Sequence, residues 1–282
     1  MRKIISVVKL IRIHNCLMAA IGVSVGWYLA GSGGGRQVYL TSLAVALVCG
    51  AGNALNDFLD IENDRINHPH RPLPQGELNP ASALIVFVLF NLTAIVLGLK
   101  VDAAVTVTII AGILLLIIYN LLLKRLLFWG NIAVSILGGS TFLVGGLSVS
   151  SASLTMIPGP IVPAAFAFLF HLGRELLKDI ADLKGDRLNG YRTLPSILSP
   201  PKAQALAALI FGLLILVSLI PILQGWYRPA YNIITIGLVD IPLIILLAAV
   251  FIVKDIDRLK VINSLLKFLM IFGLLAFILG KR

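Results

Sequence analysis

Acidic side chains in this chain of 282 residues gather in two segments, 53–64 and 175–186. Of the 13 Asp and Glu residues in the chain, the first segment holds Asp57, Asp60, Glu62 and Asp64, and the second holds Glu175, Asp179, Asp182 and Asp186. A helix turns by about 100° per residue, so positions 53, 57, 60 and 64 fall within an arc of about 60°. The spacing therefore predicts two helices that each carry a strip of carboxylates.

The two segments match each other when the first is moved along the chain by 122 positions, which takes 57 to 179, 60 to 182 and 64 to 186. The same shift takes Asn56 onto Lys178. The segments lie at the ends of the second and sixth predicted membrane spans, so both helices run in the same direction. This pattern predicts a parallel internal duplication that brings two acidic helix ends to one face of the protein.

Carboxylates on one helical face repel each other, and the repulsion grows where the dielectric constant is low. Magnesium binds hard oxygen ligands and completes its coordination shell with phosphate oxygens. Two facing acidic strips therefore predict a diphosphate bridged by Mg²⁺. Arg71 and Lys178 lie close to the strips and are of a type that donates directly to phosphate. A single Asp at a helix end is usually a solvated charge, so the hypothesis depends on the duplication.

The composition identifies the elements that must position these residues. Hydrophobic residues make up 59% of the chain and charged residues 13%, against about 45–50% and about 25% in soluble domains. This excludes a soluble enzyme, a disordered chain and a nucleic-acid binder, and the net charge of +10 is better explained by basic membrane loops. The composition predicts an integral membrane protein with several spans.

Stretches of about 20 apolar residues are long enough to cross a bilayer as helices. Nine such stretches are found, at residues 14–31, 38–59, 82–100, 103–123, 131–150, 160–182, 203–223, 233–253 and 262–280. The predicted fold is all-α: a polytopic membrane protein forming a single domain over 1–282. Nine transmembrane helices, in two parallel pseudo-repeats, are expected to surround a central cavity that opens to the cytoplasmic side.

The orientation follows from the distribution of Lys and Arg, which favour cytoplasmic loops. With nine spans, only Arg36, Lys100, Arg228, Lys281 and Arg282 of the 23 basic residues fall on one side. The other side also carries both acidic segments. We therefore expect the site to face the cytoplasm from within the cell membrane.

The motifs at the two acidic segments resemble those of a known family. Asn56-Asp57-x-x-Asp60-x-x-x-Asp64, followed by Arg71-Pro72-Leu73-Pro74, resembles the first signature of the UbiA-type intramembrane prenyltransferases. Asp179-x-x-Asp182-x-x-Gly185-Asp186, followed by Gly190-Tyr191-Arg192, resembles the second. The nine predicted spans match that family too, so the resemblance covers nearly the whole chain and implies a prenyltransferase.

The resemblance also implies roles for individual residues, with Mg²⁺ as the cofactor. The implied metal ligands are Asn56, Asp57, Asp60, Asp64, Asp179, Asp182 and Asp186. The implied catalytic residues are Asp60, Asp64, Asp182, Asp186, Tyr119 and Lys124. The expected substrate-binding residues are Arg12, Asn15, Asn56, Arg65, Arg71, Lys178 and Arg192. Arg12, Lys124 and Arg192 are candidates for holding a phosphate of the acceptor, with Asn15 as a neutral partner.

Segments 12–17 and 66–76 are similar to one branch of that family, the digeranylgeranylglyceryl phosphate synthases. This implies Mg²⁺-dependent transfer of a geranylgeranyl group from geranylgeranyl diphosphate to the glycerol hydroxyl of geranylgeranylglyceryl phosphate, a step of ether lipid biosynthesis. The expected partners are a prenyl diphosphate, a lipid-like glycerol phosphate acceptor and membrane lipids, with no nucleic acid.

Two alternatives stay open. One is an aromatic acceptor, such as 4-hydroxybenzoate, for the same prenyl transfer. The other is a polytopic transporter, whose coupling acids are expected near the membrane midplane on broken helices. The acidic segments here lie at predicted helix ends instead, which favours the enzyme.

Overall fold

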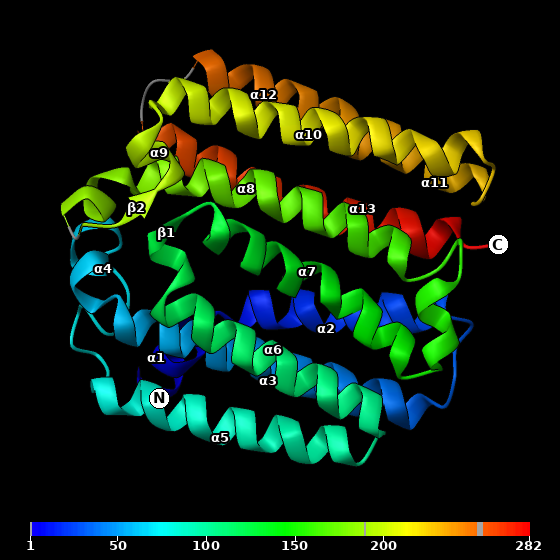
Figure 1. The fold of residues 1–282 in the computed structure, drawn as a ribbon, viewed down its shortest axis with the longest axis horizontal. Coiled ribbons are helices and arrows are strands. Elements are labelled where there is room, and N and C mark those ends of the chain that lie inside the picture. Colours follow the sequence, from blue (N-terminus) through cyan, green and yellow to red (C-terminus); the bar gives the residue numbers. More distant parts are fainter. Residues whose placement is uncertain (1, 189, 253–255) are drawn as a thin grey trace.

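The computed structural model describes residues 2–188, 190–252 and 256–282, and it shows long helices lying side by side (Figure 1). The helices are α1 Arg2–Leu10, α2 Ile13–Leu29, α3 Gly35–Leu59, α4 Ile61–Asn67, α5 Pro80–Leu99, α6 Ala103–Leu121, α7 Trp129–Leu147, α8 Ile161–Leu188, α9 Leu194–Ile197, α10 Pro200–Leu223, α11 Pro229–Ile234, α12 Ile241–Ile252 and α13 Ile256–Gly280. Short turns of helix are η1 Leu123–Arg125, η2 Ser151–Thr155 and the π-helical η3 Thr235–Asp240. Strands β1 Leu126–Leu127 and β2 Arg192–Thr193 pair in parallel.

Seven helical segments within the described residues are long and apolar enough to span a membrane. They are Gly35–Leu59, Pro80–Leu99, Ala103–Arg125, Trp129–Leu147, Pro200–Leu223, Pro229–Ile252 and Arg258–Gly280. The chain is therefore an all-helical integral membrane protein, as predicted. Of the predicted stretch 233–253 and the basic residues counted above, Val253 and Lys254 lie outside the described residues.

The stretch predicted over 14–31 is occupied by the single helix α2, and the shorter helix α1 precedes it at an angle. Helices α1 and α2 form a pair bent by 51°, which counts as an eighth span if the two are taken together. Arg12 lies at the bend with a φ of 51°, in the left-handed region that a non-glycine residue rarely adopts. The predicted stretch 160–182 coincides with α8 from Ile161 onward, and the middle of that helix carries Arg174, Glu175 and Lys178.

Small residues bring the helices at the centre of the bundle close together. A Cβ atom added to Gly26 on α2 would lie 2.0 Å from the carbonyl oxygen of Phe142 on α7, and one added to Gly145 would lie 2.0 Å from that of Val23. Membrane helices use such contacts because lipid gives them no hydrophobic reason to associate. The backbones of α2 and α7 are thereby held together.

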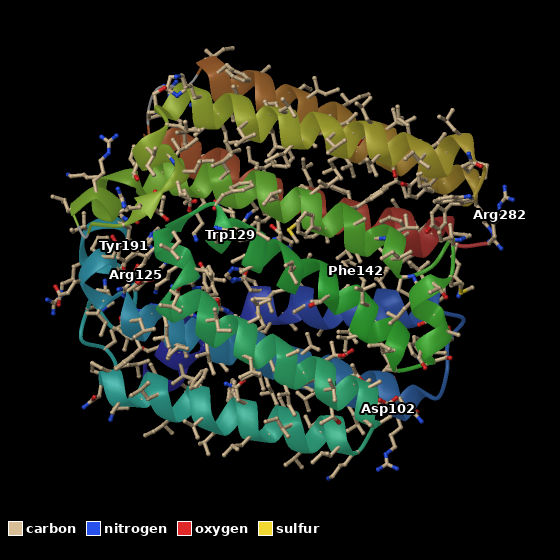
Figure 2. The ribbon with its side chains drawn as sticks, in the orientation of Figure 1. Asp102, Arg125, Trp129, Phe142, Tyr191 and Arg282 are labelled. Carbon is tan, nitrogen blue, oxygen red and sulfur yellow. The ribbon has the colours of Figure 1, made fainter. Side chains whose placement is uncertain are left out.

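The short elements α4, β1, β2 and α9 gather at one end of the bundle (Figure 1). Tyr191 and Arg125 lie at this end, whereas Asp102 and Arg282 lie at the other (Figure 2). Helix α1 begins nearer the first end, and the C-terminus lies at the opposite one (Figure 1). Both acidic segments belong to the end that carries the short elements.

Candidate active site

A polar cavity of about 60 Å³ lies between the two acidic segments at this end of the bundle. It brings together predicted site residues from both halves of the chain: Arg12, Asn56, Asp60, Asp64, Arg71, Tyr119, Lys124, Lys178, Asp179, Asp182 and Asp186. Five further residues line it: Asn63, Asn67, His68, Tyr191 and Thr193. The carboxylates of the two segments thus face a common space.

The first acidic segment is not the uninterrupted helix that its spacing suggested. Helix α3 ends at Leu59, Asp60 has φ −104° and ψ 15°, and α4 starts at Ile61. Backbone hydrogen bonds still run across the break, from the Asp60 amide to Asn56 O at 3.0 Å and from the Asp64 amide to Asp60 O at 2.7 Å. These bonds preserve the turn, so Asp60 and Asp64 both line the cavity.

Every aspartate of the first segment is paired with a cation. Lys124 Nζ lies 2.7 Å from Asp60 Oδ1, and Arg71 Nη1 lies 2.5 Å from Asp64 Oδ2 and 3.3 Å from Asp57 Oδ1. Arg12 also donates to Asp57. Such charge-assisted hydrogen bonds are about twice as strong as neutral ones. Burial raises the pKa of the Asp64 carboxyl above its ordinary value, and the nearby Arg71 opposes that shift.

The second acidic segment runs without a break along α8, and its partners are different. Asn131 on α7 donates to Asp179 at 2.8 Å, and Asn63 on α4 donates to Asp186 at 3.2 Å. The Nε2 atom of His68 lies 3.2 Å from Asp182 Oδ1. In the described part of the chain, neither Lys nor Arg forms an ion pair with these three carboxylates.

Helix α4 lies directly on α8, and Gly185 permits this approach. A Cβ atom at Gly185 would lie 2.3 Å from Asn67 Nδ2 and 2.4 Å from Asn63 Oδ1. Asn67 donates to the Asp182 carbonyl oxygen at 3.0 Å and accepts from the Gly185 amide at 3.2 Å. The amides of the first segment therefore fix its position against the second.

The mouth of the cavity is bordered by the segment that follows α8. The Tyr191 hydroxyl donates to Asp60 Oδ1 at 3.1 Å, and Arg125 lies 5.2 Å from the centre of the Tyr191 ring (Figure 2). Burial, and then the charge of Asp60, raise the pKa of Tyr191 to about 12, so the hydroxyl stays a donor at neutral pH. Pairing of β1 with β2 brings Leu127 opposite Thr193 and holds this segment beside η1.

Four predicted site residues lie outside the cavity lining. Asp57 is buried behind it between two arginines, and Asn15 is half-buried on α2. Arg65 pairs with Glu62 at 2.8 Å on the exposed side of α4, and Arg192 is exposed on β2. The amides that sequence reasoning missed, Asn63 and Asn67, each lie three positions after an aspartate, a spacing that shares a helical face.

The donor set suits a hard divalent cation, because carboxylate and amide oxygens are the ligands that Mg²⁺ takes. Within residues 2–188, 190–252 and 256–282, no three acidic, His or Cys side chains are arranged to hold a metal ion. The ion pairs explain this, since Lys124, Arg71 and His68 take up carboxylate oxygens. A larger groove of about 270 Å³ between α12 and α13 is lined only by apolar residues, which excludes it as a diphosphate site.

Comparison with known proteins identifies the protein family. Residues 17–278 match the UbiA prenyltransferase family, and the chain belongs to this family. The family resemblance read from the sequence is confirmed, and the chain is a prenyltransferase enzyme.

Among its relatives, the digeranylgeranylglyceryl phosphate synthase of Methanococcoides burtonii is 36% identical, over 96% of this chain and 98% of its own length. The synthase of the same name from Saccharolobus solfataricus is 32% identical, over 98% of this chain and 96% of its own.

Solved structures show the same fold. A structure described as digeranylgeranylglyceryl phosphate synthase in membranes matches with a TM-score of 0.72 at 30% identity, covering 99% of both chains. The UbiA homologue of Aeropyrum pernix K1 matches with a TM-score of 0.78 at 19% identity and 95% coverage of both chains. A UbiA homologue from Archaeoglobus fulgidus, bound to DMAPP and Mg²⁺, matches with a TM-score of 0.67 at 16% identity, over 96% of this chain and 99% of its own.

Proposed function

We propose that this enzyme transfers a geranylgeranyl group from geranylgeranyl diphosphate to the glycerol hydroxyl of geranylgeranylglyceryl phosphate. The observation that carries the proposal is the single cavity in which Asp60 and Asp64 face Asp182 and Asp186, with Lys and Arg side chains between them. The names of relatives that are 32% and 36% identical over nearly their whole length support this acceptor.

The proposed cofactor is Mg²⁺, supported by the donor set and by the A. fulgidus homologue bound to DMAPP and Mg²⁺. The residues proposed to hold it with the diphosphate are Asn56, Asp60, Asp64, Asp179, Asp182 and Asp186. When bound, the cation neutralises charge that develops on the leaving diphosphate. Asp57 lies behind the cavity, so we assign it the positioning of Arg12 and Arg71.

The cations of the first segment exchange partners when the diphosphate enters. Lys124 and Arg71 now bond Asp60 and Asp64, and each can turn from a carboxylate to a phosphate oxygen, which would leave the two carboxylates free to hold Mg²⁺. Lys178, which also lines the cavity, is a third donor to the diphosphate. These donors accelerate ionisation of the allylic C1–O bond to the extent that they bind the departing diphosphate more tightly than the intact substrate.

The proposed topology has nine spans in two parallel pseudo-repeats. Helix α8 contains 28 residues, about 42 Å at 1.5 Å per residue, so it is long enough to cross a bilayer. Adding α8 to the seven apolar segments and the bent pair gives an odd number of spans. This supports a chain whose termini lie at opposite ends of the bundle (Figure 1). The basic residues that accompany the acidic segments support a cytoplasmic site.

The test uses the purified protein with Mg²⁺, labelled geranylgeranyl diphosphate and either geranylgeranylglyceryl phosphate or 4-hydroxybenzoate. We expect a labelled diether phosphate from the first acceptor and no product from the second. A prenylated aromatic product would overturn the acceptor assignment while leaving the prenyl transfer intact. Solute exchange across liposomes without any chemical turnover would favour the transporter instead.

A further inference from the structure

A second group of basic side chains is carried by α2, α8 and α13, and α13 packs against both of the other helices. It consists of His14, Arg174 and Lys267, with Arg12 and Lys178 shared with the diphosphate cavity. Lys267 follows Arg258, where its span begins, by nine positions, about 14 Å along the helix axis. Ionisable residues at such depth are costly to keep against lipid, so they usually mark a functional path or site.

In the part of the chain that the structure describes, the carboxylates close to this basic group are already paired with its other cations, which leaves Lys267 without one. The charged residues that act most strongly on Lys267 are Arg174 and Arg12, followed by Glu175 and Lys178. Those that act on His14 are Lys267, Arg12 and Arg174. Asp57 already pairs with Arg12, and Glu175 bonds Arg174 at 2.7 Å and Lys178 at 3.1 Å. Among the described residues, Lys267 has no carboxylate at ion-pair distance.

Arg174 has a hydrogen-bond donor to spare. Its side chain is 14% exposed, and its Nη1 atom is used by Glu175. Its Nε atom is buried and has no hydrogen-bond partner. A buried donor without an acceptor costs about 1–3 kcal/mol, so an anion beside Arg174 would relieve that penalty and balance the charge of the group.

We propose that Arg174 and Lys267, with His14 at the outer edge, bind the phosphate monoester of a lipid-tailed acceptor. The inference rests on the proposed function and names the subsite that selects its acceptor. It replaces two residues expected from the sequence, because Lys124, which bonds Asp60, is assigned to the diphosphate and Arg192 is exposed on β2.

The position of this subsite suits the reaction. Arg12 and Lys178 line the diphosphate cavity and also belong to the basic group, so the two anion sites adjoin. An acceptor phosphate at Arg174 and Lys267 therefore holds the nearby glycerol hydroxyl next to the cavity where C1 is released. His14 is exposed on α2, and α2 packs against α13, so the subsite has an open edge at the bundle surface, where lipid tails reside.

The test is the variant Lys267→Gln, with the KM measured separately for each substrate in neutral detergent. We expect the KM for geranylgeranylglyceryl phosphate to rise about tenfold or more, as the loss of a charged hydrogen bond predicts. The KM for geranylgeranyl diphosphate should change less than about twofold. Lys267→Arg should retain most of the affinity. The control Lys202→Gln removes the same charge from an exposed site at the start of α10 and should change neither KM.

A second measurement asks whether the phosphate itself is recognised. The wild type should prefer geranylgeranylglyceryl phosphate to geranylgeranylglycerol, and Lys267→Gln should lose most of that preference. If Lys267→Gln does not fold, Arg174→Lys, which keeps a cation beside Glu175, is measured in the same way. An unchanged acceptor KM in an active variant overturns the subsite alone, whereas a wild type that forms no diether product overturns the proposed function.

Anionic bilayer lipids carry similar phosphate chemistry, so the assay is repeated in phosphatidylcholine vesicles with and without phosphatidylglycerol. An effect of Lys267→Gln on acceptor KM in phosphatidylcholine alone supports the subsite. An effect that appears only with phosphatidylglycerol would mean that the group binds bulk lipid, and it would overturn the proposal.

Discussion

The two acidic segments have matching sequences but different electrostatic surroundings. In the first, Asp60 is bonded to Lys124 and Asp64 to Arg71, so the carboxylates are neutralised by full positive charges. In the second, Asp179 and Asp186 are held by the neutral amides of Asn131 and Asn63. The duplicated spacing therefore places the acids, while residues from other helices decide how much charge each segment keeps.

This difference suggests a division of labour. The carboxylates of the first segment bind the cations that we assign to the diphosphate. Those cations become free only when the carboxylates bind another positive group. The second segment presents carboxylates without Lys or Arg partners among the described residues, and those are the groups that attract a divalent cation most strongly. We therefore expect the second segment to dominate metal affinity and the first to dominate diphosphate affinity.

The largest effects are expected from the central aspartates of the two segments. Asp60→Ala and Asp182→Ala should each abolish transfer, by about 10³-fold or more, because each removes a charged group facing the cavity. Chelation of the metal with EDTA should do the same to the wild type. The milder variants distinguish the segments: Asp182→Asn should raise the Mg²⁺ concentration at half-maximal rate more than Asp60→Asn does. Elution as a monodisperse peak in detergent would show that the variants fold.

If either alanine variant stays fully active with Mg²⁺, the site built from both segments is wrong. If the two asparagine variants shift the Mg²⁺ requirement equally, the division of labour is wrong while the site stands.

The next effect concerns the contact that aligns the two segments. Gly185→Ala should lower the rate by about tenfold to a hundredfold, because its methyl group would collide with Asn63 and Asn67 and push α4 away from α8. Gly212→Ala on α10 is a matched control, since no atom lies within 4 Å of its added Cβ. Steady-state rates of both variants test this, and an equal loss in both would indicate general helix sensitivity instead.

Particular residues show which features of the fold and the site could be predicted from the sequence and which could not. The apolar stretches and the spacing of the aspartates were sufficient to predict the membrane helices and the acidic segments that line the cavity. The break at Asp60 was not predictable from spacing, because the hydrogen bonds across it keep the helical turn. The roles of Asn63, Asn67 and Asn131 depend on which helices become neighbours. Arg192 was expected to bind a phosphate because of its positive charge, but it is exposed on β2, which pairs with β1.

A smaller effect, mainly on stability, is expected from Asp57, which lies behind the cavity. Asp57→Asn leaves Arg12 and Arg71 short of one carboxylate in a buried place, and breaking a buried ion pair costs about 3–5 kcal/mol when a charge is left uncompensated. Arg71 keeps Asp64, so we expect the lower part of that range. Glu62→Gln is the control, because its pair with Arg65 is exposed and is worth about 0–1 kcal/mol.

Thermal unfolding in detergent, followed by the loss of a monodisperse peak, measures both variants. A Tm of Asp57→Asn equal to that of Glu62→Gln would contradict the positioning role. A raised Mg²⁺ requirement with an unchanged Tm would place Asp57 among the metal ligands after all.

The smallest effect is expected from Tyr191, at the edge of the cavity. Tyr191→Phe removes the hydroxyl that donates to Asp60, and a hydrogen bond to a charged group contributes about 1.5–3 kcal/mol. Lys124 still holds Asp60, so we expect only a several-fold loss of rate, with the aromatic contact to Arg125 preserved. Tyr39→Phe, on an exposed ring of α3, is the control. Since the lost bond belongs to the first segment, the KM for the prenyl diphosphate should rise while the Mg²⁺ requirement stays the same. A higher Mg²⁺ requirement with an unchanged KM would assign metal binding to both segments alike.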